Sequence, residues 1–189
     1  MKTPEILITG TSEQYNEAVN GCRQLFMNKT RDYGTSWTVL RPVSIVDQIF
    51  IKAQRIRTIQ EKKTQKVGED IRSEFVGIVN YGIIGLIQIH YGPESKEISP
   101  DTVANWYDEM VSKCRQIMQD KNHDYGEAWR LMSQESFADL ILMKLRRIRQ
   151  IIANEGKTLV SEGVDANFTD IVNYSLFALI LIDEGIHNR

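Results

Sequence analysis

The sequence predicts an all-α fold, a duplicated helical bundle, and two observations support that prediction. Apolar residues recur at intervals of three and four, which is the period of a helix with a buried face, rather than in strict alternation. The chain also repeats itself, because a shift of 92 positions places Cys-Arg-Gln at 22–24 on the same tripeptide at 114–116. The same shift places Asp-Tyr-Gly at 32–34 on 124–126. Ordered matches of rare residues over such a length indicate an internal duplication.

The repeat divides the chain into two halves, residues 1–92 and 93–189, which we expect to form one compact unit. After a one-residue insertion the shift becomes 93, and Ile-Val-Asn-Tyr at 78–81 meets the same tetrapeptide at 171–174. A polar loop with glycine and proline at residues 92–100 joins the halves. We expect about three main helices per half and a pseudo-two-fold packing of the halves, as in a fused homodimer.

The helices are predicted in the same order in each half. The first pair begins near Ser12 and Asp101, which are residue types that cap helix N-termini. These helices end at the Asp-Tyr-Gly turns, where glycine permits a positive φ, and a short amphipathic turn with a tryptophan follows. Residues 6–10 form the one strand-like stretch. The expected helix bounds are 12–28, 44–61 and 68–90 in the first half and 101–120, 136–153 and 161–186 in the second.

The third helix of each half is predicted to be central. Residues 83–87 and 176–180 are apolar on nearly every side of their helices. A helix of this kind is buried in its fold. We therefore expect residues 77–90 and their counterparts to lie in the core, near the pseudo-two-fold contact.

The composition excludes several classes of protein. Lys plus Arg number 23 and Asp plus Glu number 25, a net charge of -2, so the basic excess of a duplex nucleic acid binder is missing. The apolar runs are too short and too polar for a membrane span, and the N-terminus does not resemble a signal peptide. Cys22 and Cys114 form no disulfide framework and are predicted core residues, which favours a cytoplasmic location.

The second helix of the second half carries an acid and two bases beside its apolar stripe. At about 100° per residue, Arg147 lies about 80° and Lys144 about 140° from Asp139. The two basic side chains suit phosphate oxygens, and we expect Asp139 to support a metal ion or to orient water. A competing interpretation makes these three residues structural ion pairs between helices.

The third helix of the second half gathers carboxylates. Glu162, Asp165 and Asp170 share one face of about 140° with Asn173. Clustered carboxylates repel one another unless a cation balances them, and hard oxygen ligands suit Mg²⁺. We therefore expect the three acids to bind Mg²⁺, and Asp139, Glu162 and Asp170 to be catalytic. The competing interpretation is a solvated acidic face.

The two halves differ at these acidic positions. Asp165 aligns with Arg72, and Asp170 aligns with Gly77, so the first half lacks two of the three carboxylates. A metal site would therefore use the ligands of the second half, giving one site per chain. The first half would contribute packing.

Three further features have both a structural and a functional interpretation. The Asp-Tyr-Gly turns either simply end the first helices or help to form a site. Trp37, Trp106 and Trp129 are either packing anchors or, in the repeats, platforms for a nucleobase. The basic residues of the second helices form either a solvated face or an anion site for a nucleotide.

The motifs of the second half combine, in chain order, Lys121, Asp124, Tyr125, Gly126 and Trp129, then Asp139, Lys144, Arg147 and Ile148, then Glu162, Asp170, Asn173 and Tyr174. This combination resembles the nucleotide modification associated domain 1 family. The family includes proteins of bacteria and phages, and its name reflects an inferred link to nucleotide metabolism. The resemblance covers both halves, and the first half departs from it at Gly77.

A weaker similarity, at the level of the fold, is to all-α nucleoside triphosphate pyrophosphohydrolases of the MazG type. Glu162-x-x-Asp165 matches one of their Mg²⁺-binding motifs, whereas the Glu-Glu-x-x-Glu motif is missing. Together the resemblances imply nucleotide handling, most concretely Mg²⁺-dependent hydrolysis of a nucleoside triphosphate. The residues expected to bind the substrate and its phosphates are Lys121, Asp124, Lys144, Arg147 and Asn173.

Two other interpretations stay open. One is a non-catalytic helical module that binds a nucleotide or a protein partner. The other is a purely structural pseudo-dimer. Self-association of the chain is compatible with all three.

Overall fold

The computed structural model describes residues 5–92, 97–159 and 161–189, and this part of the chain is helical with no strand. The predicted all-α class is confirmed. The elements are α1 (Glu5–Tyr33), η1 (Ser36–Val39), α2 (Pro42–Lys62), α3 (Ile71–Tyr91), α4 (Pro100–Tyr125), η2 (Ala128–Leu131), α5 (Gln134–Ala153) and α6 (Val164–Asp183), where η marks a short 3-10 helix.

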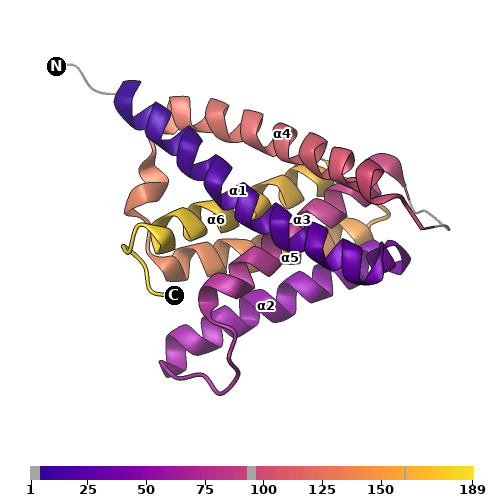
Figure 1. Ribbon diagram of the computed structural model, residues 1–189, viewed down its shortest axis with the longest axis horizontal. Coiled ribbons are helices and arrows are strands. Elements are labelled where there is room, and N and C mark those ends of the chain that lie inside the picture. The colour runs from indigo at the N-terminus through magenta and orange to yellow at the C-terminus, as the bar shows by residue number, and fades with distance from the viewer. Residues whose placement is uncertain (1–4, 93–96, 160) are drawn as a thin grey trace.

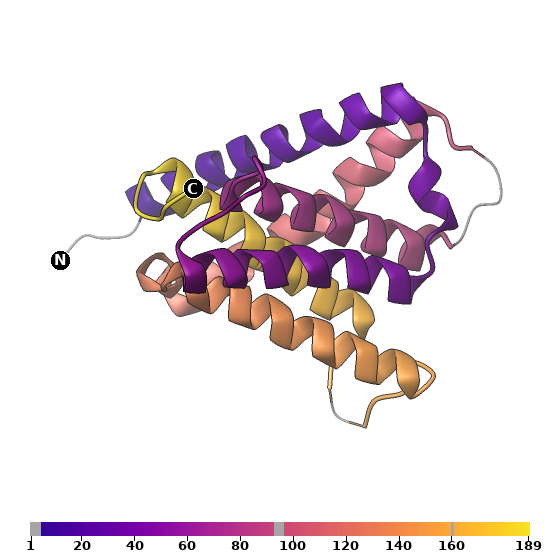
Figure 2. The same ribbon diagram turned by 90° about the horizontal axis from the view of Figure 1, so that it is seen from below.

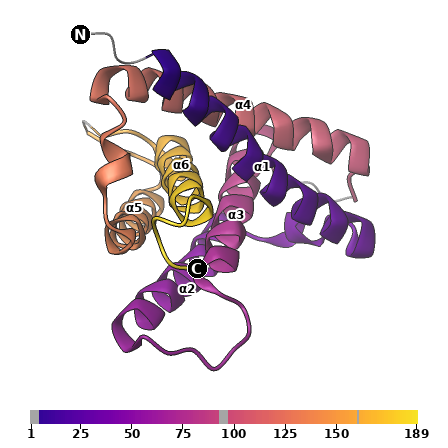
Figure 3. The same ribbon diagram turned by 60° about the vertical axis from the view of Figure 1, so that its left-hand side comes forward.

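The helices form two layers. α2, α3, α5 and α6 make a four-helix bundle in which α3 packs on α6, α2 packs on α5, and each half contributes one antiparallel pair. The long helices α1 and α4 lie across the α3–α6 side of this bundle (Figures 1 and 3). α2 and α5 form the opposite side, which faces the viewer in Figure 2. Both halves contribute to one continuous hydrophobic core.

A reciprocal set of buried hydrogen bonds relates the two halves. The Tyr15 hydroxyl donates to Asn173 Oδ1 at 2.8 Å, and the Asn173 amide donates to the Cys114 carbonyl at 3.1 Å. The same contacts, at the same distances, recur among Tyr107, Asn80 and Cys22. Each tyrosine thus donates to an asparagine of the other half, as a pseudo-two-fold axis requires.

The predicted central position of the third helices is confirmed. Residues 78–87 are buried almost throughout, and exposure begins at residue 89 near the end of α3. α3 approaches α6 closely because it has glycine at the crossing. A Cβ on Gly82 would lie 2.7 Å from a methyl group of Val172, and one on Gly85 would meet the ring of Phe168.

The helix starts differ from the prediction. α1 begins at Glu5, so Ser12 lies inside the helix rather than at its N-cap, and the strand-like residues 6–10 are helical. The cap of α4 is Ser99, whose hydroxyl accepts from the Thr102 amide, rather than Asp101. Pro100 at the first helical position explains this shift, because proline lacks the amide hydrogen that is unsatisfied there.

The glycine turns that end the first helices are confirmed, but the helices run to Tyr33 and Tyr125, five residues beyond the predicted ends at 28 and 120. Gly34 and Gly126 have φ values of 70° and 57°, the left-handed region that favours glycine. The short tryptophan-bearing turns that follow are η1 and η2. Residues 93–96 of the predicted joint, like the first four residues, lie outside the described part of the chain.

Within the described residues, no helix combines the length and apolarity needed to cross a membrane.

Candidate functional site

A cleft of about 720 Å³ opens where α5 ends and α6 begins. Its walls come from the last turns of α5, from loop residues 154, 157–159 and 161–162, and from the first turns of α6, and residues 154–159 extend beyond the bundle in Figure 2. We call it the α5–α6 cleft. Its lining includes the side chains of Lys144, Arg147, Gln150, Asn154, Lys157, Leu159, Glu162 and Asn167.

At the inner end of the cleft, Asp170 is held between two lysines. Lys144 Nζ lies 2.6 Å from Asp170 Oδ2, and Lys121 Nζ lies 2.7 Å from Asp170 Oδ1. Asp170 and Lys144 are buried, whereas the Lys121 side chain is half exposed. Burial lowers the pKa of Lys121, but the hydrogen bond and charge of Asp170 more than offset this, so the pKa lies above its ordinary value. The cluster therefore carries a net positive charge.

Tyr174 connects this cluster electrostatically to Arg147. Burial and the Asp170 charge raise the pKa of the Tyr174 phenol, while the charges of Lys121 and Arg147 act to lower it. The phenol thus lies within electrostatic reach of all three charged groups. Lys121 and Lys144 thus contact the buried carboxylate from two helices, and Arg147 lies on the cleft wall without pairing with it.

Arg147 forms no salt bridge with any acid among the described residues. Its one side-chain hydrogen bond among those residues is a weak one, with 3.8 Å from Arg147 Nη2 to the Met143 sulfur. In the first half the corresponding Arg55 lies 2.5 Å from Glu74 and also donates to the Glu69 carbonyl. The repeat places Asn167 where the first half has Glu74, so Arg147 has lost that acid and remains a free cation on the wall of the cleft.

Asn167 itself is buried and oriented. Its Nδ2 donates to the Gly163 carbonyl at 2.8 Å. A carbonyl can only accept, so this contact fixes which end of the amide is nitrogen and leaves Oδ1 as the free end. Within the described part of the chain, no group donates to Asn167 Oδ1. The cleft wall therefore contains an oriented hydrogen-bond acceptor beside a free guanidinium.

The structure does not bring the three expected metal ligands together. Glu162 and Asp165 are exposed, and the described residues contain no group of three acids, histidines or cysteines placed to hold a metal ion. Both oxygens of Asp170 already accept from lysine ammonium groups. The two lysine ammonium groups beside Asp170 would repel a divalent cation, so this arrangement of charges is unfavourable for Mg²⁺.

Asp139 lies away from the cleft. Its carboxylate is 3.7 Å from Arg57 across the α2–α5 contact, and the mirrored pair, Asp47 and Arg149, is 2.7 Å apart. The structural ion-pair interpretation therefore describes Asp139. Asp139 and Lys144 are separated by about 140° around the axis of α5. Asp139 therefore points toward α2, and Lys144 points toward α6.

Two other predicted substrate contacts have different surroundings. Asn173 is buried and both ends of its amide are bound, by Tyr15 and by the Cys114 carbonyl, so it is part of the core. Asp124 is exposed at the end of α4 and contacts only the neighbouring His123 among the described residues, at 3.0 Å. The residues that the structure does bring together are Lys121, Lys144, Arg147 and Asp170.

The tryptophans are packing anchors. Trp129 is buried and stacks on Phe177 with 4.1 Å between ring centroids, and its indole N–H donates to Asn122. Trp106 stacks in the same way on Tyr91. Cys22 and Cys114 are buried free thiols, as predicted, and burial raises the pKa of each to about 12.

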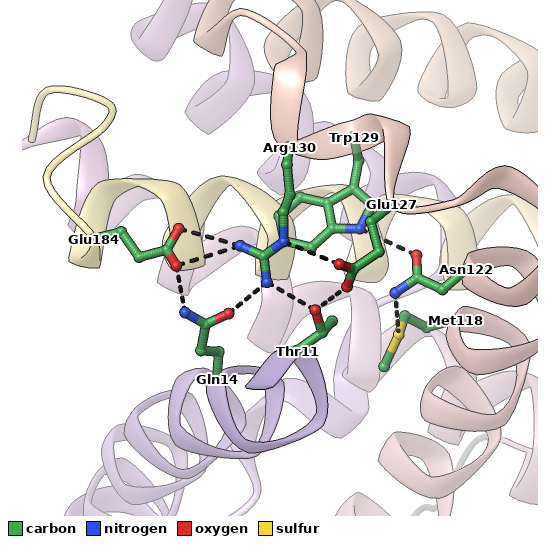
Figure 4. Close-up of polar contacts among 8 residues, drawn as sticks. All are labelled: Thr11, Gln14, Met118, Asn122, Glu127, Trp129, Arg130 and Glu184. Carbon is green, nitrogen blue, oxygen red and sulfur yellow. Dashed lines mark hydrogen bonds and ion pairs between the residues drawn. The ribbon is translucent and has the colours of Figure 1, made fainter. Parts of the chain in front are cut away.

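A second polar cluster lies at the other end of α6, about 30 Å along the helix from the cleft. Figure 4 shows Arg130 at its centre, donating to Thr11 at 2.7 Å and to Gln14 at 2.6 Å and reaching Glu184 at 3.3 Å. Thr11 also donates to Glu127. Every carboxylate of this cluster is bound by residues of α1 or η2. The cluster therefore fastens the start of α1 to the second half.

Sequence reasoning missed the amide side chains of the cleft, Gln150, Asn154 and Asn167, and the base Lys157. One signal was available, because the repeat aligns Asn167 with Glu74 and so exchanges an acid for a neutral amide. The loop residues had no such signal. Their place on the cleft wall depends on the path of the chain between α5 and α6.

Comparison with known proteins identifies one family. A family model described as nucleotide modification associated domain 1 matches residues 29–89 and again residues 121–182. The two matched segments correspond to the two halves of the repeat. No curated protein and no solved structure matches the chain.

Proposed function

We propose that this chain, which belongs to the nucleotide modification associated domain 1 family, binds a phosphorylated nucleoside in the α5–α6 cleft of its second half. The observation that carries the proposal is the free Arg147 guanidinium on the wall of the cleft. Arginine presents several N–H donors in a fixed plane that matches the oxygens of a phosphate group.

The charges around Arg147 favour an anion. Lys144 and Lys157 also line the cleft, and Lys121 adds a half-exposed ammonium group beside Asp170. Asp170, Glu162 and Glu155 are acids of this region, and Glu155 pairs with Lys157 at 3.2 Å, so Arg147 remains the wall cation with no acid partner among the described residues. An anion entering the cleft would therefore gain attraction without first having to break the Asp170 ion pairs.

The size of the cleft suits a nucleotide. Ligand pockets for small molecules commonly enclose about 300–1,000 Å³, and the α5–α6 cleft has about 720 Å³. Apolar and amide side chains lie on the same walls, with Ile151 and Leu159 among the former. A phosphate end and a less polar base end can thus both be accommodated.

Asp170 has a positioning role in this proposal. Its two oxygens hold the Lys121 and Lys144 ammonium groups in place, which limits the rotamers that must be ordered when a phosphate binds. Mg²⁺-dependent hydrolysis is not included, because Asp170 is paired with two lysines and no group of three possible metal ligands forms among the described residues. Release of pyrophosphate in the presence of Mg²⁺ would correct this part of the proposal.

The test is calorimetric titration with the common ribo- and deoxynucleoside mono- and triphosphates, each with and without Mg²⁺. We expect binding without metal, and Arg147→Gln should weaken it by about 2 kcal/mol, roughly 30-fold. The matched control is Arg146→Gln, which removes the same charge one position away on a side chain that does not line the cleft. Equal losses in both variants, or no binding of any nucleotide by the wild-type chain, would favour the protein-binding module.

A further inference from the structure

We propose that Asn167 accepts a hydrogen bond from a sugar hydroxyl of the bound nucleotide and so sets the sugar specificity of the cleft. This inference rests on the proposed function. It starts from an unusual group: a side chain that is only 4% exposed, lines a cleft, and has an acceptor oxygen without a donor among the described residues. An amide oxygen on a cleft wall can accept a hydrogen bond from a ligand.

The Gly163 carbonyl determines what Asn167 can recognise. It accepts from the amide nitrogen, so the end of the amide that stays available is an oxygen with no hydrogen to give. This end repels phosphate oxygens and pairs with O–H or N–H groups. Asn167 therefore recognises the part of the ligand that donates hydrogen bonds.

The first half shows how near Asn167 lies to the phosphate position. Arg55 and Glu74, at the positions equivalent to Arg147 and Asn167, are in direct contact at 2.5 Å. Asparagine is one methylene shorter than glutamate, so the second half has space between the two side chains. With the α-phosphate on Arg147, the adjoining part of the ligand lies against Asn167, and beyond the α-phosphate that part is the sugar.

The base then has a separate place farther along α5. Gln150 and Asn154 follow Arg147 by three and seven residues on one face of the helix, which is about 5 and 10 Å along its axis. Both line the cleft, as does the fully exposed side chain of Leu159. The α-phosphate, sugar and base thus lie in that order from Arg147 toward loop residues 154–159.

The experiment compares sugar forms in the wild-type chain and in Asn167→Ala. The probes are nucleoside triphosphates with the same base in ribo, 2′-deoxy and 2′,3′-dideoxy form, titrated calorimetrically. In the wild type we expect removal of the contacted hydroxyl to weaken binding about tenfold. In Asn167→Ala all three forms should bind with nearly equal affinity, because the acceptor is gone.

The outcomes separate this inference from the proposed function. Equal affinity for the three sugar forms in the wild type overturns it while Arg147-dependent binding still stands. The same holds if the sugar preference persists in Asn167→Ala. Absence of nucleotide binding overturns both proposals. The wild-type comparison needs no variant, so it remains decisive even if Asn167→Ala fails to fold.

Discussion

The two halves share one fold but treat the same cationic positions in opposite ways. In the first half, Lys52 and Arg55 both contact Glu74, at 3.3 and 2.5 Å, and the position of Asp170 is Gly77. In the second half the acid has moved one helical turn along the third helix, to Asp170.

The consequence of that move is a free arginine. Asp170 pairs with Lys144 and Lys121, whereas Arg147 lines the cleft together with Asn167 and has no acid partner among the described residues. The first half neutralises its cations within the fold, and the second keeps one available. One helical turn in the position of an acid thus separates a structural ion pair from a candidate anion site.

The largest expected effect tests what the halves have in common. Burial raises the pKa of Cys22 and Cys114 from 9.0 to about 12. Below pH 9 both the folded and unfolded chains keep the thiol protons. Above it only the unfolded chain loses them, so stability falls as the pH rises toward 12. The expected loss at pH 11 is about 3 kcal/mol per thiol, measured by urea unfolding from pH 8 to 11.

Single substitutions check the symmetry of this effect. Cys22→Ala and Cys114→Ala should each reduce the pH dependence of the free energy of unfolding by the same amount. The comparison is of slopes, so the constant cost of the smaller side chain cancels. Unequal slopes would show that the two cores are not equivalent.

The next effect tests where the halves differ. Asp170→Ala leaves the buried Lys144 ammonium without its carboxylate, and we expect a loss of about 3 kcal/mol in the free energy of unfolding. The matched variant in the first half is Glu74→Ala. Its partners, Lys52 and Arg55, are 28% and 24% exposed against 9% for Lys144, so solvent screens them more and the cost should be smaller. Equal costs in urea titrations would contradict the difference in burial.

A third measurement returns to the shared core. Tyr15→Phe and Tyr107→Phe each remove one hydroxyl from the side-chain oxygen of a buried asparagine. Each variant should lose about 2 kcal/mol in the free energy of unfolding, because the asparagine oxygen is left unsatisfied. The two losses should agree. A clear inequality would break the reciprocity seen in the structure.

The smallest expected effect comes from giving the second half the acid that the first half has at the equivalent position. Asn167→Glu restores at the second half the acid that the first half has, so Arg147 should pair with it. We expect nucleotide affinity to fall about tenfold, or about 1.4 kcal/mol. The control is Glu74→Asn in the first half, which should leave calorimetric affinity at the second half unchanged. An unaltered affinity in Asn167→Glu would show that Arg147 is not the anion contact.

The sequence was sufficient for the fold because its signals are local or repetitive. Helical periodicity, the glycine turns and the duplication each needed only the order of residues, and the apolar third helices indicated their central place. The predicted starts of α1 and α4 were wrong, because several residue types can cap a helix and only the backbone path selects Ser99 over Asp101.

The candidate site was predictable only in part. A helical wheel gives the angle between residues of one helix but not what a neighbouring helix presents to them. Asp170 looked like a metal ligand because its partners, Lys121 and Lys144, lie on two other helices. Asp139 looked like part of the site because Arg57, which binds it, lies in the other half.

The reciprocal bonds between Tyr15, Tyr107 and the two asparagines also bear on how such a protein can evolve. In an assembly of two identical chains, every mutation appears twice, so Glu74 and Asn167 would have to be the same residue. Joining the copies in one chain removes that constraint. Because each half completes the core of the other, neither can be lost while their surfaces diverge. The first half can therefore keep packing against the second while its own equivalents of the cleft residues change.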